Sequence, residues 1–273
     1  MISFFANLFG YVLNFLYQFI HNYGIAIILF SVVLKLIMLP ISIKQQKTMK
    51  KSAKIQTKMK EIQDKYKNNP EKLNQETMDL YKREKMSPFS GCLSAIIQII
   101  LLFAVFYLVR SPLTYMTKVE PAVIEQYTNE IKQQENNKNN AYPEIAIIKE
   151  KGQEDERVNI NMEFLGLDLS SVPSQDFSDW KVYVIPALYV LTSFVSMQMT
   201  TKMQTKKKED GTTDEMDAVA QANKSMSYIM PIMSVSIAII APLGLALYWL
   251  VNNILMIVER LILNKFMKDE EEE

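Results

Sequence analysis

The sequence has few of the residues that metal, disulfide and nucleotide sites require. Its 273 residues include one cysteine, Cys92, one histidine, His21, and seven glycines. One cysteine cannot close an intramolecular disulfide, and Cys92 with His21 is too small a set for a zinc site. No HExxH or GxSxG motif and no glycine-rich phosphate loop occurs. We therefore expect neither an enzyme nor a bound cofactor or metal.

The chain has no formal net charge, but its charged residues are unevenly distributed along the sequence. Thirty Lys and Arg balance thirty Asp and Glu, and 49% of the residues are hydrophobic. The apolar residues gather into blocks long enough for membrane helices, since about twenty residues cross a ~30 Å hydrocarbon core. We predict five transmembrane spans, at 24–43, 88–110, 181–201, 226–241 and 243–263.

Acidic residues are missing from the first four predicted spans, but the first span carries a cation. Lys35 lies eleven residues beyond Gly24, and a charge left in lipid there costs at least about 2.5–3.5 kcal/mol. It could extend its amine to the inner headgroups, or it could face a hydrated cavity between helices. Because Glu259 lies near the inner end of the fifth span, we do not expect an ion pair with Lys35.

Polar side chains at mid-depth in several spans favour the cavity. Singly, each could be an interhelical hydrogen bond of about 0.6 kcal/mol. Together with Lys35 they predict the lining of a cationic, hydrated groove that attracts anionic groups. The predicted groove residues are Lys35, Ser31, Ser94, Gln98, Ser193, Ser196, Gln198, Tyr248, Trp249, Asn252 and Asn253.

The segments between the spans have distinct compositions. Residues 1–23 are uncharged and amphipathic, which favours an interfacial helix over a signal peptide. Residues 44–87 are basic and predict a helical hairpin that breaks at Asn68-Asn69-Pro70, and its cationic surface favours lipid over specific nucleic acid. Residues 111–180 form an acidic, partly disordered loop. Residues 202–225 are a second basic connection, and 264–273 an acidic tail.

The distribution of basic residues predicts the orientation in the membrane. Residues 44–86 contain thirteen Lys or Arg, and residues 202–208 contain four. Basic connections stay in the cytoplasm. We therefore expect the N-terminus and the acidic loop outside, and the hairpin and the C-terminal tail in the cytoplasm.

Several motifs, in this order and spacing, resemble the bacterial YidC/Oxa family of membrane protein insertases. They are LFSVVLKLIMLPISIKQQKTM at 29–49, IQDKYK at 62–67, LYKREKMSPFSGCLSAIIQ at 80–98, FLGLDLS at 164–170 and APLGLALYWLVNN at 241–253. The resemblance implies an all-α membrane protein with five transmembrane helices around a hydrophilic groove, a cytoplasmic antiparallel helical hairpin and an N-terminal interfacial helix. It also implies a groove cation, usually arginine, at position 35.

The chain departs from that family at a few positions. Lys35 keeps the charge but lacks the planar fork of arginine. Ser87 and Ser94 stand where the family often has Asn and Pro, and the acidic tail is unlike the basic tails that engage ribosomes in some relatives. No early cysteine follows the N-terminal helix, so we do not expect the lipoprotein form seen in some relatives.

The resemblance implies a multi-pass insertase of the bacterial cytoplasmic membrane. It would pass polar segments of nascent membrane proteins through the groove and release their apolar helices into lipid. Membrane lipids, the Sec translocon and the ribosome are candidate partners. The alternatives are a small-anion carrier or channel that uses the same lysine, and an assembly scaffold.

Overall fold

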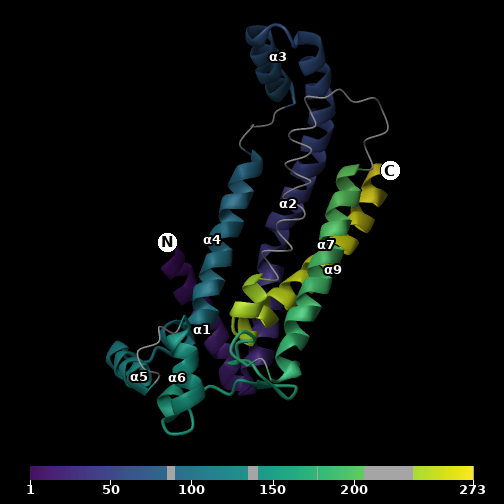
Figure 1. Ribbon diagram of the computed structural model, residues 1–273. Coiled ribbons are helices and arrows are strands. Elements are labelled where there is room, and N and C mark those ends of the chain that lie inside the picture. The colour runs from purple at the N-terminus through teal and green to yellow at the C-terminus, as the bar shows by residue number, and fades with distance from the viewer. Residues whose placement is uncertain (85–89, 135–140, 177, 206–235, 273) are drawn as a thin grey trace. The chain divides into compact units, whose positions relative to one another are not determined.

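The computed structural model describes residues 1–84, 90–134, 141–176, 178–205 and 236–272, and most of them are helical (Figure 1). The α-helices are α1 (Ile2–Ile20), α2 (Tyr23–Tyr66), α3 (Pro70–Arg83), α4 (Ser90–Arg110), α5 (Pro121–Gln134), α6 (Pro143–Lys151), α7 (Val184–Thr205) and α9 (Leu243–Glu272). The short elements are the π-helical turn η1 (Leu113–Thr117), the 3-10 turns η2 (Glu156–Val158) and η3 (Trp180–Tyr183), and the strands β1 (Glu163–Phe164) and β2 (Leu167–Asp168). The expected all-α membrane protein is confirmed at this level.

Within the described residues, four helical stretches are long and apolar enough to cross a membrane. They are Ile2–Ile20, Tyr23–Thr48, Trp180–Met199 and Leu243–Leu263. The first is the predicted interfacial helix, whose length and composition also permit a span. Helix α4 covers the predicted span at 88–110, and its described apolar part is the shorter Ile99–Arg110. Most of the predicted span at 226–241 lies outside the described residues, so the number of five spans stays a prediction.

The chain divides into two compact units, which are residues 1–35 with 103–273, and residues 36–102. In the smaller unit, α2 ends at Tyr66 and α3 begins at Pro70, where the sequence predicted a break. Asn69 caps α3 by accepting a hydrogen bond from the Lys72 amide, and Pro70 suits the first helical turn because it needs no amide donor. Figure 1 shows α3 returning beside the end of α2.

Few described side chains hold these two helices together. Ile55 and Leu80 are the buried apolar residues described between positions 36 and 102. The Lys58 Nζ lies 2.5 Å from Glu84 Oε1, but Lys58 is largely exposed, and an exposed ion pair contributes at most about 1 kcal/mol. Among the side chains that the structure describes there, α2 and α3 are therefore joined by a thin apolar seam.

In the larger unit, residues 161–171 connect the beginnings of two long helices. The Tyr23 amide at the start of α2 donates to the Asn161 carbonyl at 3.0 Å, and the Gly244 amide at the start of α9 donates to the Leu169 carbonyl at 2.9 Å. These bonds satisfy amides that a helix leaves unpaired in its first turn. The segment therefore sets α2 and α9 to begin at a common level.

The hairpin in this segment has a two-residue turn. β1 pairs antiparallel with β2 through Phe164 and Leu167. Leu165 and Gly166, between the strands, have φ of 53° and 76°. Two positive φ values are typical of the tight turn whose twist matches an antiparallel pair. The FLGLDLS motif thus has a structural role, because its turn shapes the segment that anchors α2 and α9.

Helix α1 packs closely on η1. Its buried face consists of Ala6, Phe9, Gly10 and Leu13, whereas Phe4, Leu8, Tyr11, Phe15 and Phe19 are exposed on the opposite face. Lys118 directly follows η1, donates to the side chain of Asn7 and lies over the rings of Tyr11 and Tyr115. Within the part of the chain that the structure describes, an exposed apolar face therefore runs along α1.

The acidic connection contains ordered helices in its described part. Helices α5 and α6 pack together, and residues 135–140 of this connection lie outside the described residues. Glu144 on α6 is buried and accepts bonds from the amide and the hydroxyl of Thr114, at 3.0 and 2.7 Å. Burial raises the pKa of this carboxyl, although the two Thr114 donors oppose the rise.

Replacing Gly10 should weaken the packing of α1. An added Cβ would lie 1.8 Å from the Tyr115 carbonyl oxygen, so one backbone segment must move. Overpacking of this kind costs about 1–3 kcal/mol, and we expect Gly10→Ala to lower the free energy of unfolding by that amount in a detergent titration. Gly244→Ala is the control, because its Cβ would meet neighbours at 3.5 Å, an ordinary contact. Equal stability of both variants would contradict this account.

Glu144 should make stability depend on pH. Its pKa is higher in the folded chain than its ordinary 4.5, so folding is favoured when the carboxyl is protonated. This contribution is lost as pH rises from 4.5 through the raised pKa. Glu144→Gln should therefore reduce the loss of stability on that interval, as measured by unfolding at several pH values. Glu150→Gln, at an exposed position of the same helix, should leave the slope unchanged. The prediction fails if both variants have the same slope.

Candidate intramembrane charge site

An ion pair joins α2 and α9, the two long helices whose first turns bond to residues 161–171. The Lys35 Nζ on α2 lies 2.6 Å from Glu259 Oε2 on α9. The Lys35 side chain is 21% exposed and that of Glu259 is 10% exposed, so both charges lie largely within the protein. Lys35 lies between Leu34 and Leu36, and Glu259 follows the apolar residues Ile257 and Val258. The pair is a charged site within two apolar stretches.

The expectation that Lys35 has no acidic partner is wrong. The depth of each residue within its own span does not determine the pairing, which depends on where α2 and α9 begin. Lys35 follows Tyr23, the first residue of α2, by twelve positions, and Glu259 follows Leu243, the first of α9, by sixteen. From a common starting level, the difference of four residues is a rise of only about 6 Å, which the two long side chains can bridge.

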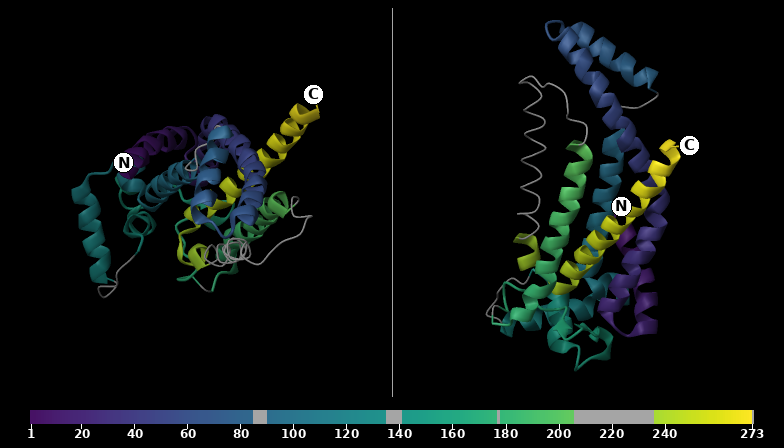
Figure 2. Two further views of the ribbon diagram at one scale, coloured as in Figure 1. Left: turned by 90° about the horizontal axis from the view of Figure 1, so that it is seen from above. Right: turned by 90° about the vertical axis from the view of Figure 1, so that its right-hand side faces the viewer.

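A second cation lies beside the pair. Arg260 follows Glu259 on α9, and its guanidinium donates to the Ser196 carbonyl of α7 at 3.1 Å and to the Ser196 hydroxyl at 3.4 Å. Ser196 is buried. Helices α7 and α9 pack against each other, and they are neighbours in Figures 1 and 2. With two cations and one carboxylate, the Lys35–Glu259–Arg260 cluster has one net positive charge.

The Glu259 carboxylate is only half satisfied by described residues. Its Oε2 contacts Lys35, but its Oε1 is buried and has no hydrogen-bond partner in the part of the chain that the structure describes. An unmade hydrogen bond at a buried acceptor costs about 1–3 kcal/mol, more for a charged group. The pair therefore does not gain the stabilisation of a fully bonded buried pair.

Other predicted groove residues form contacts between helices. Asn253 Nδ2 donates to Ser193 Oγ at 2.7 Å, which joins α9 to α7. Ser31 is buried one turn before Lys35 and donates to the Ile27 carbonyl of its own helix at 2.7 Å. These hydroxyl and amide groups are therefore hydrogen-bonded within the protein.

The remaining predicted residues have varied positions. Tyr248 is buried, and Trp249 is half-buried with its ring 5.7 Å from that of Tyr189. Asn252 is half-buried, and Gln198 is exposed. The side chains of Ser94 and Gln98 lie outside the described residues. Of the predicted groove residues, Lys35 and Ser196 thus contact the charge cluster, Ser193 and Asn253 join α7 to α9, and a continuous groove stays a prediction.

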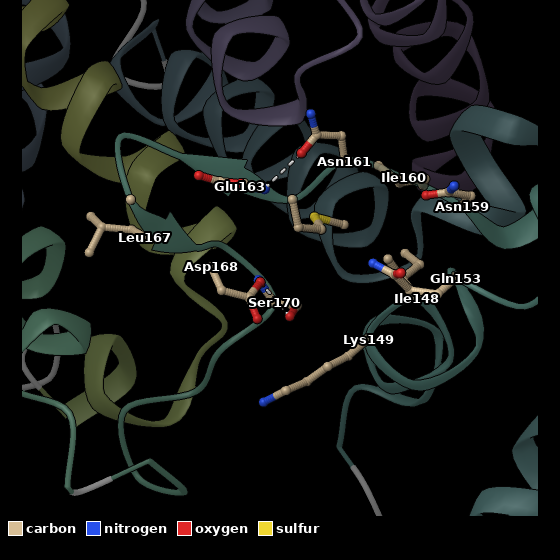
Figure 3. A pocket seen from close by; sticks show the side chains of 13 residues that line it. Ile148, Lys149, Gln153, Asn159, Ile160, Asn161, Glu163, Leu167, Asp168 and Ser170 are labelled. Carbon is tan, nitrogen blue, oxygen red and sulfur yellow. Dashed lines mark hydrogen bonds between the residues drawn. The ribbon is translucent and has the colours of Figure 1, made fainter.

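A separate cavity lies outside the long helices. It has a volume of about 550 Å³ and lies between the end of α6 and residues 159–170. Figure 3 shows Lys149 extending from α6 toward the side that carries Asp168 and Ser170. Asp168 already accepts bonds from the Ser170 amide and hydroxyl, and Lys149 lies 3.7 Å from Asp176. Its charged groups therefore have local partners.

Sequence reasoning gave no site role to two members of the cluster. The position of Glu259 near the inner end of the fifth span argued against a contact with Lys35, and Arg260 lies next to Glu259. An available signal was the acid-base dipeptide Glu259-Arg260, which interrupts the otherwise apolar residues 254–263. Charges in such a stretch need partners from another helix.

Sequence comparison extends the resemblance over nearly the whole chain. The profile of the family described as "60Kd inner membrane protein" matches residues 15–271. A protein of Geotalea uraniireducens named "Membrane protein insertase YidC" is 31% identical over 253 residues, 93% of this chain and 36% of the relative. Proteins of the same name from Caldanaerobacter subterraneus and Fusobacterium nucleatum are 27% and 26% identical over 95% and 94% of this chain.

The chain spans about a third of the length of the Geotalea relative, but 92% and 93% of the other two. The match covers α2, α4, α7 and α9, and it therefore includes Lys35, Glu259 and Arg260. Helices with membrane-spanning length and the bacterial relatives together indicate a multi-pass membrane protein. Because the family profile matches most of its residues, the chain belongs to the 60Kd inner membrane protein family, which is the YidC/Oxa family that its motifs indicated.

Proposed function

We propose that this chain is a membrane protein insertase, a non-enzymatic chaperone that moves polar segments of nascent membrane proteins through a cationic groove and releases their apolar helices into lipid. The observation that carries the proposal is the net positive Lys35–Glu259–Arg260 cluster within apolar helices. The relatives named membrane protein insertases support the same conclusion.

The cluster addresses the main energetic barrier to insertion. A polar backbone group without a partner in hydrocarbon costs several kcal/mol, and a charged group costs more. A client tail with Asp or Glu would be attracted by the net positive charge, because Coulomb energies are larger at low dielectric than in water. Ser193, Ser196 and Asn253 bring polar groups to the same helices and would replace part of the lost hydration.

Lateral release follows from the apolar surfaces of the same helices. Leu191, Phe194 and Val195 are exposed on α7, and Ile254, Val258 and Leu261 are exposed on α9. These side chains have no protein cover in the described chain, so lipid or a client helix would contact them. A client whose tail is held at the charges could therefore leave along an apolar face. The proposal needs no covalent step and no cofactor.

The surrounding segments would serve the same task. We place the N-terminus and residues 111–180 outside, and residues 44–87 in the cytoplasm, because residues 44–86 are strongly basic. The thin seam around Ile55 and Leu80 suits an element that opens to receive a client. The exposed face of α1, from Phe4 to Phe19, suits the membrane interface. Nascent membrane proteins and lipids are the partners that this arrangement requires, and the Sec translocon and the ribosome are further candidates.

Removing the charge of Lys35 should selectively impair clients with acidic tails. In proteoliposomes, Lys35→Met should lower protease-protected insertion of such a client by about tenfold, the factor that 1.4 kcal/mol represents. Lys35→Arg should retain insertion because it keeps the charge. The same client with Asn and Gln in place of its acidic residues should depend much less on Lys35.

Lys132→Met, which removes an exposed lysine of α5, is the matched control and should behave as the unaltered chain. Equal insertion of the acidic client by the Lys35→Met variant and the unaltered chain would refute the electrostatic role. Anion flux without client, combined with no client protection, would favour the small-anion carrier or channel. A protein that supports neither flux nor protection would be a scaffold.

A further inference from the structure

The partner of Lys35 belongs to the chain itself. Lys35 contacts a carboxylate, the same chemical group that an acidic client tail would bring. Glu259 reaches it from a different helix, α9, at 2.6 Å. A glutamate held at this distance occupies one of the three donors of the lysine ammonium and neutralises its charge locally. A client carboxylate would therefore have to bind a lysine that already contacts Glu259.

We propose that Glu259 is a built-in competitor for the client-binding cation, so that an acidic client binds by displacing the Glu259 carboxylate from Lys35. The inference rests on the proposed function and deepens it, since it assigns a specificity-determining residue to the same site. Glu259 acts through Lys35 and sets how strongly a client carboxylate must compete.

The bonding of Glu259 favours exchange over a permanent pair. One carboxylate oxygen bonds Lys35, while the other is buried and without a partner among the described residues. A client carboxylate with better hydrogen bonds can therefore replace it without the loss of a fully satisfied site. Released Glu259 has a neighbouring cation on its own helix, Arg260, whose guanidinium is held at Ser196. The displaced charge thus remains near a positive group.

The competitor also explains how an intramembrane lysine can stay charged between clients. An isolated ammonium in an apolar surrounding is costly, and a carboxylate partner reduces that cost. In the absence of a client, Glu259 neutralises the Lys35 ammonium, and the net positive charge of the cluster is that of Arg260 at Ser196. A neutral tail has no group that can take the place of Glu259. Glu259 therefore restricts binding at Lys35 to anionic groups that can displace a carboxylate.

The test compares binding of two peptides to the full chain in lipid nanodiscs. Both peptides have one apolar helix, and their N-terminal tails carry either two Asp or two Asn. The ratio of their dissociation constants, measured by fluorescence anisotropy, reports preference for the acidic tail. Glu259→Gln keeps the size of the side chain and removes its charge. It should raise the preference at least about tenfold over the unaltered chain.

Two further variants separate competition from structure. Glu150→Gln makes the same substitution at an exposed position of α6, and it should leave the preference unchanged. Lys35→Met with Glu259→Gln should show no preference, because the cation is gone. If Glu259→Gln has the same preference as the unaltered chain, or if no variant binds either peptide, the proposal is overturned.

Insertion of the acidic client is measured on the same proteins. If the unaltered chain inserts the client but Glu259→Gln does not change the binding preference, Glu259 is not a competitor and the insertase function is kept. A changed preference in a protein that inserts no client would support the competitor and reject the insertase. If Glu259→Gln fails to fold, Glu259→Asp gives a second measurement. Its shorter side chain keeps the charge but reaches Lys35 less well, so it should raise the preference by a smaller factor, and no rise would overturn the proposal.

Discussion

The contact between Lys35 and Glu259 is the interaction on which this account of the chain depends. Each residue alone would be a costly charge in an apolar helix, and together they form a site that can persist there. The pair requires that α2 and α9 approach each other at Lys35 and Glu259. The helix packing and the candidate chemistry are therefore parts of one constraint.

That approach is established at the opposite end of the helices. Residues 161–171 receive the first amide of α2 and an early amide of α9, so a small segment with a two-residue turn determines the level at which both helices begin. Gly24, beside Tyr23, permits the close approach, because a Cβ there would lie 2.5 Å from the Phe164 ring. A motif far from the charges in sequence thus aligns the residues that carry them.

The sequence was sufficient to predict the helical membrane class and the family, and it directed attention to position 35. These predictions depend on local properties, such as the length of an apolar block and the cost of one charge within it. The partner of Lys35 could not be found in this way, because pairing depends on where α9 begins relative to α2. Similarly, the spacing of Ser193 and Ser196 predicted a polar helix face but not that Asn253 and Arg260 would bind it.

Cross-linking provides the most direct test of the central pair. In a Cys92→Ser background, Lys35→Cys with Glu259→Cys should be joined by a short bismaleimide in native membranes, because the two side chains meet between α2 and α9. Lys35→Cys with Val258→Cys is the control, since Val258 lies on an exposed face of the same helix. Efficient linkage of the first pair and weak linkage of the second is the predicted result. No linkage at 35 and 259, or equal linkage of both pairs, would contradict the account.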